Sequence, residues 1–191
     1  IAARESVGFS VYGIRCIASV PARRREEMES VYLGVDLGGT NILAAVVAAD
    51  GTVLGRAKND VTLDKGMEAV ARQMWDLSDL ALTRTEYDWE SVATIGIAVP
   101  SAVDPQTGNV LCAPNLGWKN EPARPVISEV FDRPVVLEND VNCGVWGEFK
   151  CGAAKGYDNV AGYFIGTGIG GGLVLNGQLH LGVRGMAAEL G

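Results

Sequence analysis

Residues 35–41 read VDLGGTN, and they lie between two apolar runs at 31–36 and 42–48. Two such runs joined by a short glycine turn predict a β-hairpin. Glycines at the turn let successive backbone N–H groups point to one side, and donors grouped in this way bind phosphate oxygens. A tight turn that an aspartate caps explains the same residues, so this stretch alone leaves both interpretations open.

Two side chains of this turn fit the phosphate interpretation. Thr40 supplies a hydroxyl donor, whereas Asp36 would repel a phosphate unless a cation lay between them. Mg²⁺ suits that place because it binds carboxylates and phosphates and keeps several of its waters. We therefore expect Asp36 to hold Mg²⁺, through water.

The rest of the chain alternates strand and helix patterns. A third strand is expected at 53–61, and apolar residues at helical spacing predict a helix at 66–83. Continuous apolar runs at 92–100 and 134–140 are typical of buried parallel strands. A helix closed by glycines follows at 141–156, and 159–182 predict strand, glycine turn and strand. This order indicates an α/β fold with a mixed sheet flanked by helices.

A second glycine-rich turn follows at 166–172, GTGIGGG. It matches the dinucleotide fingerprint G-x-G-x-x-G, but that fingerprint needs a helix directly after it, and LVLNGQLHL is strand-like. Two phosphate-type hairpins instead indicate two clamps on one polyphosphate. Gly166, Thr167 and Gly168 are the residues expected at the second clamp.

Acidic and amide side chains end the buried run at 134–140, as Glu138, Asn139 and Asp140. The carboxyl end of a buried strand is where α/β folds place groups that face a ligand. Phosphoryl transfer to an alcohol needs a base that accepts the hydroxyl proton, and an aspartate suits this task. An aspartate just before a helix is also a common N-cap, so the local sequence leaves both roles open for Asp140.

Composition and charge narrow the function classes. The 191 residues carry a net charge of −7, which argues against a surface that coats nucleic acid. The apolar runs are too short to cross a bilayer. Cysteines at 16, 112, 143 and 151 form no C-x-x-C pair, so we expect a reduced, cytoplasmic protein without a disulfide framework. The first residues lack the continuous apolar stretch of a signal peptide, and we expect 1–30 to be an extension, with translation starting at Met28.

Six motifs in order resemble the ROK family of sugar kinases and repressors, within the actin-like ATPase superfamily. They are LGVDLGGTN at 33–41, GIAVPSAVDPQTG at 96–108, PNLGW at 114–118, LENDVN at 137–142, GTGIGGG at 166–172 and AAELG at 187–191. The resemblance implies the actin-like, ribonuclease H-like fold, with a small lobe at 31–144 and the beginning of a larger, similar lobe at 145–191. It is strongest to bacterial ROK glucokinases.

The resemblance also implies an activity, the phosphorylation of a hexose by ATP at its 6-hydroxyl, with glucose as the first candidate. Fructose, mannose, N-acetylglucosamine and N-acetylmannosamine are alternatives, and so is a sugar-sensing repressor. Asp140 would be the base. The residues of the first turn would hold the ATP phosphates: Gly38, Gly39, Thr40 and Asn41. Other residues would bind the sugar or line its site: Ser101, Asn115, Asn139 and Glu189.

Further expectations rest on the same resemblance. The ligands of a structural Zn²⁺ would lie beyond Gly191, and the full-length protein would be a homodimer. With the second lobe only begun, the sheet expected at 160–181 would have an unpaired edge, so we expect these 191 residues alone to be inactive or poorly folded.

Overall fold

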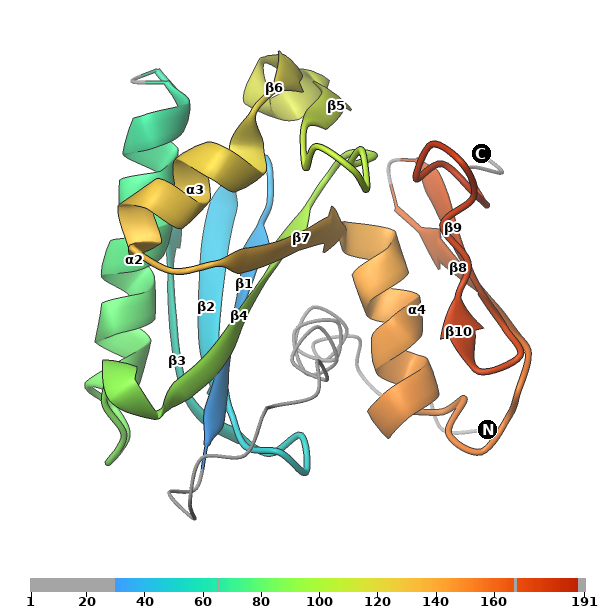
Figure 1. Cartoon of the computed structure of the whole chain (residues 1–191), viewed down its shortest axis with the longest axis horizontal. Coiled ribbons are helices and arrows are strands. Elements are labelled where there is room, and N and C mark those ends of the chain that lie inside the picture. Colours follow the sequence, from blue (N-terminus) through green and yellow to red (C-terminus); the bar gives the residue numbers. More distant parts are fainter. Residues whose placement is uncertain (1–29, 65, 167, 189–191) are drawn as a thin grey trace.

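The computed structural model describes residues 30–64, 66–166 and 168–188, and its elements carry the labels of Figure 1, in which the first helix is α2. The expected start at Met28 and the extension at 1–29 lie outside the described residues. So do the candidate site residues Thr167 and Glu189.

The first sheet has five strands and the mixed pairing that the sequence predicts. Strands β1 (Val31–Leu37), β2 (Asn41–Val47) and β3 (Val53–Asp60) form an antiparallel meander. Strand β4 (Val92–Val99) pairs with β1 in parallel, and β7 (Val135–Asn139) pairs with β4 in parallel, so the order is β3-β2-β1-β4-β7. The carboxyl ends of β1, β4 and β7 therefore meet at one edge of the sheet.

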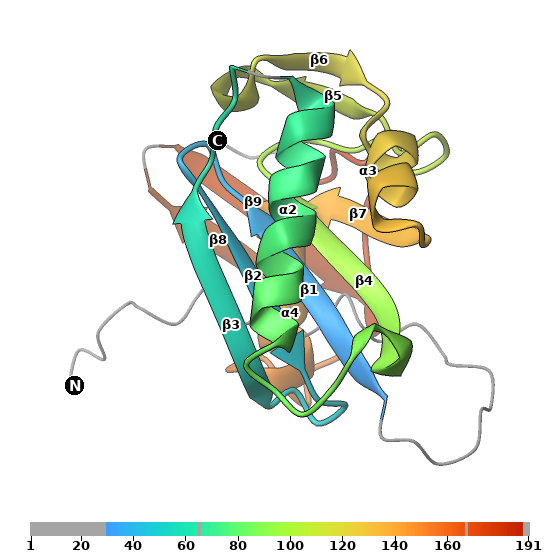
Figure 2. The same ribbon diagram turned by 90° about the vertical axis from the view of Figure 1, so that its left-hand side faces the viewer.

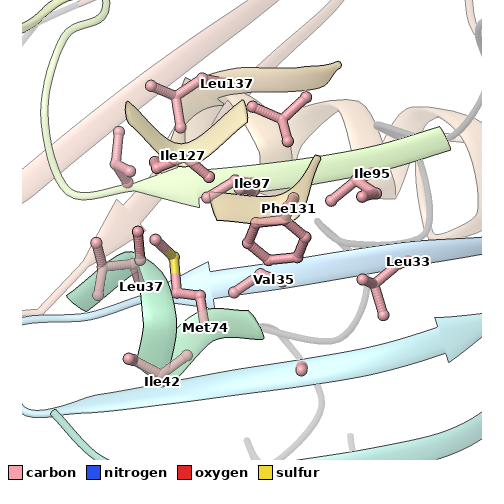
Figure 3. Packing of buried hydrophobic residues seen from close by; sticks show 14 of the residues in the cluster. Leu33, Val35, Leu37, Ile42, Met74, Ile95, Ile97, Ile127, Phe131 and Leu137 are labelled. Atoms are coloured by element: carbon pink, nitrogen blue, oxygen red, sulfur yellow. The ribbon is translucent and has the colours of Figure 1, made fainter. Parts of the chain in front are cut away.

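Helices α2 (Met67–Leu82) and α3 (Ala123–Phe131) pack on one face of this sheet (Figure 2). Side chains alternate between the two faces of a strand, so every second apolar residue of β1, β4 and β7 points at these helices. Together they form the main core (Figure 3): Leu33, Val35, Leu37, Ile42, Met74, Ile95, Ile97, Ile127, Phe131 and Leu137. Asp36, between two of these residues, belongs to the opposite face.

Helix α4 (Asp140–Cys151) follows β7 directly and lies on that opposite face (Figure 1). Cys143 of α4 packs against Ala98 of β4. The helix also contacts a second, antiparallel sheet of β8 (Val160–Ile165), β9 (Ile169–Leu175) and β10 (Gln178–Leu179). Because α4 contacts both sheets, it joins them, and the expected division at 144/145 falls inside this helix.

Several short elements at 89–131 are absent from the sequence prediction. Strands β5 (Val110–Ala113) and β6 (Trp118–Glu121) form a hairpin around the 3-10 turn η2 (Pro114–Leu116), and α3 follows it. A further 3-10 turn, η1 (Trp89–Ser91), precedes β4. Within the described part of the chain, no helix is both long and apolar enough to span a membrane.

Candidate functional site

The junction of β7 and α4 carries the candidate base. Asp140 is the first residue of α4, and the N-cap is Asn139, whose side-chain oxygen accepts the N–H of Asn142 at 3.0 Å. The alternative that Asp140 is the N-cap is therefore wrong. The carboxylate of Asp140 accepts the N–H of Val141 at 2.8 Å and an N–H of the Asn139 amide at 3.1 Å. A negative charge at a helix N-terminus is also favoured by the helix dipole.

A pocket of about 340 Å³ opens at this junction. Its wall brings together three of the expected site residues, Ser101, Asn139 and Asp140, with Cys112 of β5 and Gly170 of β9. The pocket thus lies between the carboxyl edge of the first sheet and the second glycine-rich hairpin. Polar groups from separate elements converge on a partly apolar cavity, which is the usual character of a small-molecule site.

Two residues of this wall are held by the protein framework. The Ser101 hydroxyl donates to the carbonyl of Cys112 at 2.9 Å and accepts its N–H at 3.2 Å, which fixes β5 beside the loop after β4. The Asn139 amide donates to the Ser101 carbonyl at 3.3 Å while its oxygen caps α4. Any sugar contact by Ser101 or Asn139 would share atoms with these bonds.

The turn between β1 and β2 places Gly39 against Asn115. The N–H of Gly38 is bonded to the Asn41 carbonyl at 2.9 Å, so Gly38 closes the turn. A Cβ on Gly39 would sit 3.0 Å from the Cβ of Asn115, so only glycine permits this approach without displacement. The expected phosphate turn therefore touches the PNLGW segment, although neither lines the pocket at Asp140.

Thr40 and Asn41 bond to each other in this turn, since the Asn41 amide donates to the Thr40 hydroxyl at 3.1 Å. Thr40 is exposed at the tip. The position leaves its side chain open to a ligand that approaches from solvent.

Asp36 lies in one cross-strand row with Ala98 and Glu138, on the face opposite α2 and α3. With strands about 4.8 Å apart, its Cα is roughly 10 Å from that of Glu138. The residues described contain no group of three His, Cys, Asp or Glu that could hold a metal by themselves. Mg²⁺ in phosphate sites is usually held by one or two carboxylates together with the substrate phosphates, and a single aspartate beside a glycine turn fits that donor set.

The second glycine-rich hairpin contains two kinds of glycine. Gly166 and Gly168 lie in open space, and the Gly166 N–H is bonded to the Gly168 carbonyl at 2.9 Å. A Cβ on Gly170 would sit 2.5 Å from Val141, and one on Gly172 would sit 2.8 Å from Val145. The first pair suits a ligand-facing turn, whereas the second pair allows β9 to pack closely on α4.

Sequence reasoning assigned no role to Glu138 and Asn142, which the structure places at the centre of the junction. Glu138 accepts the backbone N–H of Asn139 at 2.8 Å and an amide N–H of Asn142 at 3.0 Å. Burial raises the pKa of the Glu138 carboxyl, and the hydrogen bonds from Asn142 and Asn139 oppose that rise. The alternation of strand faces, applied to LENDVN, would have separated Glu138 from Asn139.

Known proteins resemble this chain in sequence and in fold. The model of the ROK family matches residues 32–191. A glucokinase of Streptomyces coelicolor is 37% identical over 161 residues, which cover 83% of this chain and 48% of that protein. A crystal structure of a ROK family glucokinase from Streptomyces griseus, in complex with glucose and AMPPNP, superposes with a TM-score of 0.76 at 35% identity, covering 85% of this chain and 50% of that one.

Repressors are among the similar proteins too. A xylose repressor of Caldicellulosiruptor bescii is 29% identical over 159 residues, which cover 83% of this chain and 40% of that protein. The chain thus spans about half or less of the length of the curated relatives it matches.

Proposed function

Because the chain belongs to the ROK family, we propose that the protein is a sugar kinase that transfers the γ-phosphoryl group of ATP to glucose. The observation that carries the proposal is the position of Asp140, at the head of α4 and in the wall of a pocket that also contains Gly170 of the second hairpin. The similar Streptomyces glucokinases support ATP and glucose as the substrates to test first.

The proposed reaction is a direct phosphoryl transfer. The 6-hydroxyl oxygen of the sugar attacks the γ-phosphorus, the bond from that phosphorus to the bridging oxygen of ADP breaks, and the hydroxyl proton passes to the carboxylate of Asp140. Sugar 6-phosphate and ADP are the products. Asp140 is suited to accept the proton because its hydrogen bonds to Val141 and Asn139 fix its orientation.

The two glycine turns would hold the nucleotide phosphates, with Gly39, Thr40 and Gly168 among the donors. When bound, Mg²⁺ would neutralise phosphate charge, and Asp36 is the residue that would hold it. Asn115 belongs to the PNLGW segment and lies against Gly39 of the first glycine turn. From this position it would contact the sugar. The pocket at Ser101, Asn139 and Asp140 would enclose the reacting end of the sugar.

Turnover with a panel of hexoses tests this proposal, with the protein expressed from its full natural reading frame. We expect glucose-dependent ADP release in the parent and a fall of about 10²–10⁴-fold in kcat for Asp140→Asn. Asp64→Asn is the matched control, because Asp64 is exposed and does not line this pocket. Equal turnover by the parent and Asp140→Asn would remove Asp140 as the base.

A sugar-sensing repressor is the second candidate, favoured by the similarity to the xylose repressor. A repressor that retains this pocket would bind sugar without releasing ADP. Sugar binding by calorimetry together with no turnover on any hexose would therefore favour it. Turnover with an N-acetylated sugar but not glucose would keep the kinase and change the substrate.

A further inference from the structure

We propose that Glu138 and Asn142 form a positioning pair that fixes the first turn of α4 and thereby the carboxylate of Asp140. The inference rests on the proposed function for its catalytic consequence. Its structural part concerns hydrogen bonds across the junction of β7 and α4 and can be tested without any sugar.

Asn142 is tied to the end of the strand by two hydrogen bonds, and one of them is made by Glu138. The backbone N–H of Asn142 is held by Asn139, and its side-chain N–H is held by Glu138 at 3.0 Å. Glu138 also accepts the backbone N–H of Asn139 at 2.8 Å. Asp140 lies between these anchors, so its position follows from theirs.

Burial makes the tie from Glu138 to Asn142 hard to replace. Asn142 is only 2% exposed, so water has little access to its amide. Glu138 is the acceptor for the amide N–H, and removing that acceptor would leave a buried donor unsatisfied. Such a loss is costly for a buried group, and the first turn would shift to relieve it.

The other end of the same amide supports this assignment. Among the described residues, the side-chain oxygen of Asn142 has no hydrogen-bond partner. It lies against β9, where a Cβ on Gly172 would be 3.3 Å from it. Reversing the amide would set this oxygen against the Glu138 carboxylate, which is an acceptor when ionised. Glu138 therefore determines which way the Asn142 amide points, even though the amide oxygen is left without a partner.

The position of Asn142 extends the effect beyond the first sheet. Glu138 belongs to β7 of the first sheet, and Gly172 belongs to β9 of the second. Asn142 lies between the two, on the helix that joins them. The pair consequently sets Asp140 relative to both walls of the pocket, including Gly170.

Three variants separate a positioning role from a purely structural one. Glu138→Ala removes both hydrogen bonds, whereas Glu138→Gln keeps an oxygen that can accept them. Asn142→Ala removes the hydrogen bond to Glu138, which lowers stability. It also removes the buried oxygen that has no partner, and this gain offsets the loss. Glu129→Ala is the control, since Glu129 is exposed on α3.

We would measure kcat and the KM for glucose, with hydrogen exchange of residues 140–146 as the readout independent of activity. For Glu138→Ala we expect faster exchange and a fall in kcat of about tenfold or more at a KM near that of the parent, because displacements of about 1 Å cost on the order of 100-fold in rate. Glu138→Gln should restore both values. Asn142→Ala should lose kcat while melting close to the parent.

Opposite results would overturn the inference. One is a parent-like kcat in Glu138→Ala, or in Asn142→Ala should Glu138→Ala not fold. The other is a Glu138→Gln variant that is as impaired as Glu138→Ala. If the parent itself turns over no hexose, the proposed function fails, and exchange alone decides: unchanged exchange in Glu138→Ala and Asn142→Ala refutes the pair.

Discussion

Glu138, Asn139 and Asp140 are consecutive, yet each faces different surroundings. Asn139 is buried on the side of the core helices and caps α4, whereas Glu138 belongs to the opposite face of β7. Asp140 is past the strand and belongs to the helix. Strand alternation followed by the start of a helix is enough to send three neighbouring side chains in three directions. A cap, an anchor and a candidate base thus fit into three residues.

The burial of Glu138 predicts a pH dependence of stability at this residue. An ordinary glutamate titrates near 4.5, and burial raises the pKa of Glu138 in the folded state. The folded protein therefore holds this proton more tightly than the unfolded chain does. The stabilising contribution is complete below the ordinary pKa and is lost as the pH rises through the raised one.

Replacing Glu138 with glutamine removes this titration and leaves the nearby acids, Asp36 and Asp140, in place. The free energy of unfolding of Glu138→Gln, relative to the parent, should therefore rise as the pH increases from below 4.5 through the raised pKa of Glu138. Urea unfolding at several pH values measures this difference. A difference that stays constant or falls with pH would show that Glu138 does not titrate as its burial requires.

The sequence left the role of Asp140 open because whether Asn139 or Asp140 is the N-cap depends on which of the two residues ends the strand. Pairing of β4 with β7 ends at Val99 opposite Asn139. Pro100 follows Val99 and has no N–H to continue the ladder. The last strand residue is therefore Asn139, which becomes the N-cap. Local propensity cannot settle this, because Asn and Asp are about equally good N-caps.

At the scale of elements, the glycines of β8 and β9 predict where the second sheet tolerates a side chain. A Cβ on Gly162 would sit 2.4 Å from Val145 of α4, and valine has little freedom to move in a helix. Gly162→Ala should therefore destabilise the protein by about 1–3 kcal/mol through overpacking. Thermal or urea unfolding measures this cost.

Gly166→Ala is the matched comparison, because nothing lies within 4 Å of the added Cβ. Its stability should stay within about 0.5 kcal/mol of the parent. If the turn binds phosphate as proposed, nucleotide affinity should nevertheless fall in this variant. Parent-like ATP binding in Gly166→Ala would argue that the turn is structural only, and a parent-like stability in Gly162→Ala would contradict the close packing of α4.

Long periodic elements could be predicted from the sequence, and short ones could not. The helix expected at 66–83 is α2, and the apolar run at 92–100 is β4, because each has a continuous pattern that burial enforces. The hairpin of β5 and β6 has strands of four residues, which are too short to show a period. Helix α3 contains Pro125, normally a sign against a helix, but the residue is in the first turn, where proline is tolerated.

Whole-molecule architecture follows from how the two sheets use α4. The first sheet is covered by α2 and α3 on one face and contacts α4 on the other, so both its faces have helical partners. In the second sheet, α4 packs on the face that carries Gly162 and Phe164. The row that points away from α4 includes Tyr163, Ile165 and Ile169, which are 57%, 81% and 51% exposed. Strand β8 is also an edge of its sheet among the described residues.

Exposed apolar surface of this kind usually marks a contact site. The region that matches this chain is about half of the similar glucokinases. We propose that a segment like their remaining half covers the far face and the edge of β8. The 191 residues alone should then bind a hydrophobic dye such as ANS and self-associate, whereas the full natural reading frame should do neither. Both results are expected if residues 145–191 begin a second lobe.

Substitution on the exposed row tests the same proposal from the other side. Ile165→Lys should lower dye binding and self-association of the 191 residues, because it places a charge in the most exposed position of the row. In the full reading frame the same change should destabilise the protein by burying an unpaired charge. Leu80→Lys on α2 is the control, since Leu80 is exposed at 44% and belongs to a helix far from β8 in the chain. If the 191 residues are monomeric without dye binding, and Ile165→Lys is as harmless as Leu80→Lys in the longer protein, the far face of β8 is an ordinary surface that no second lobe covers.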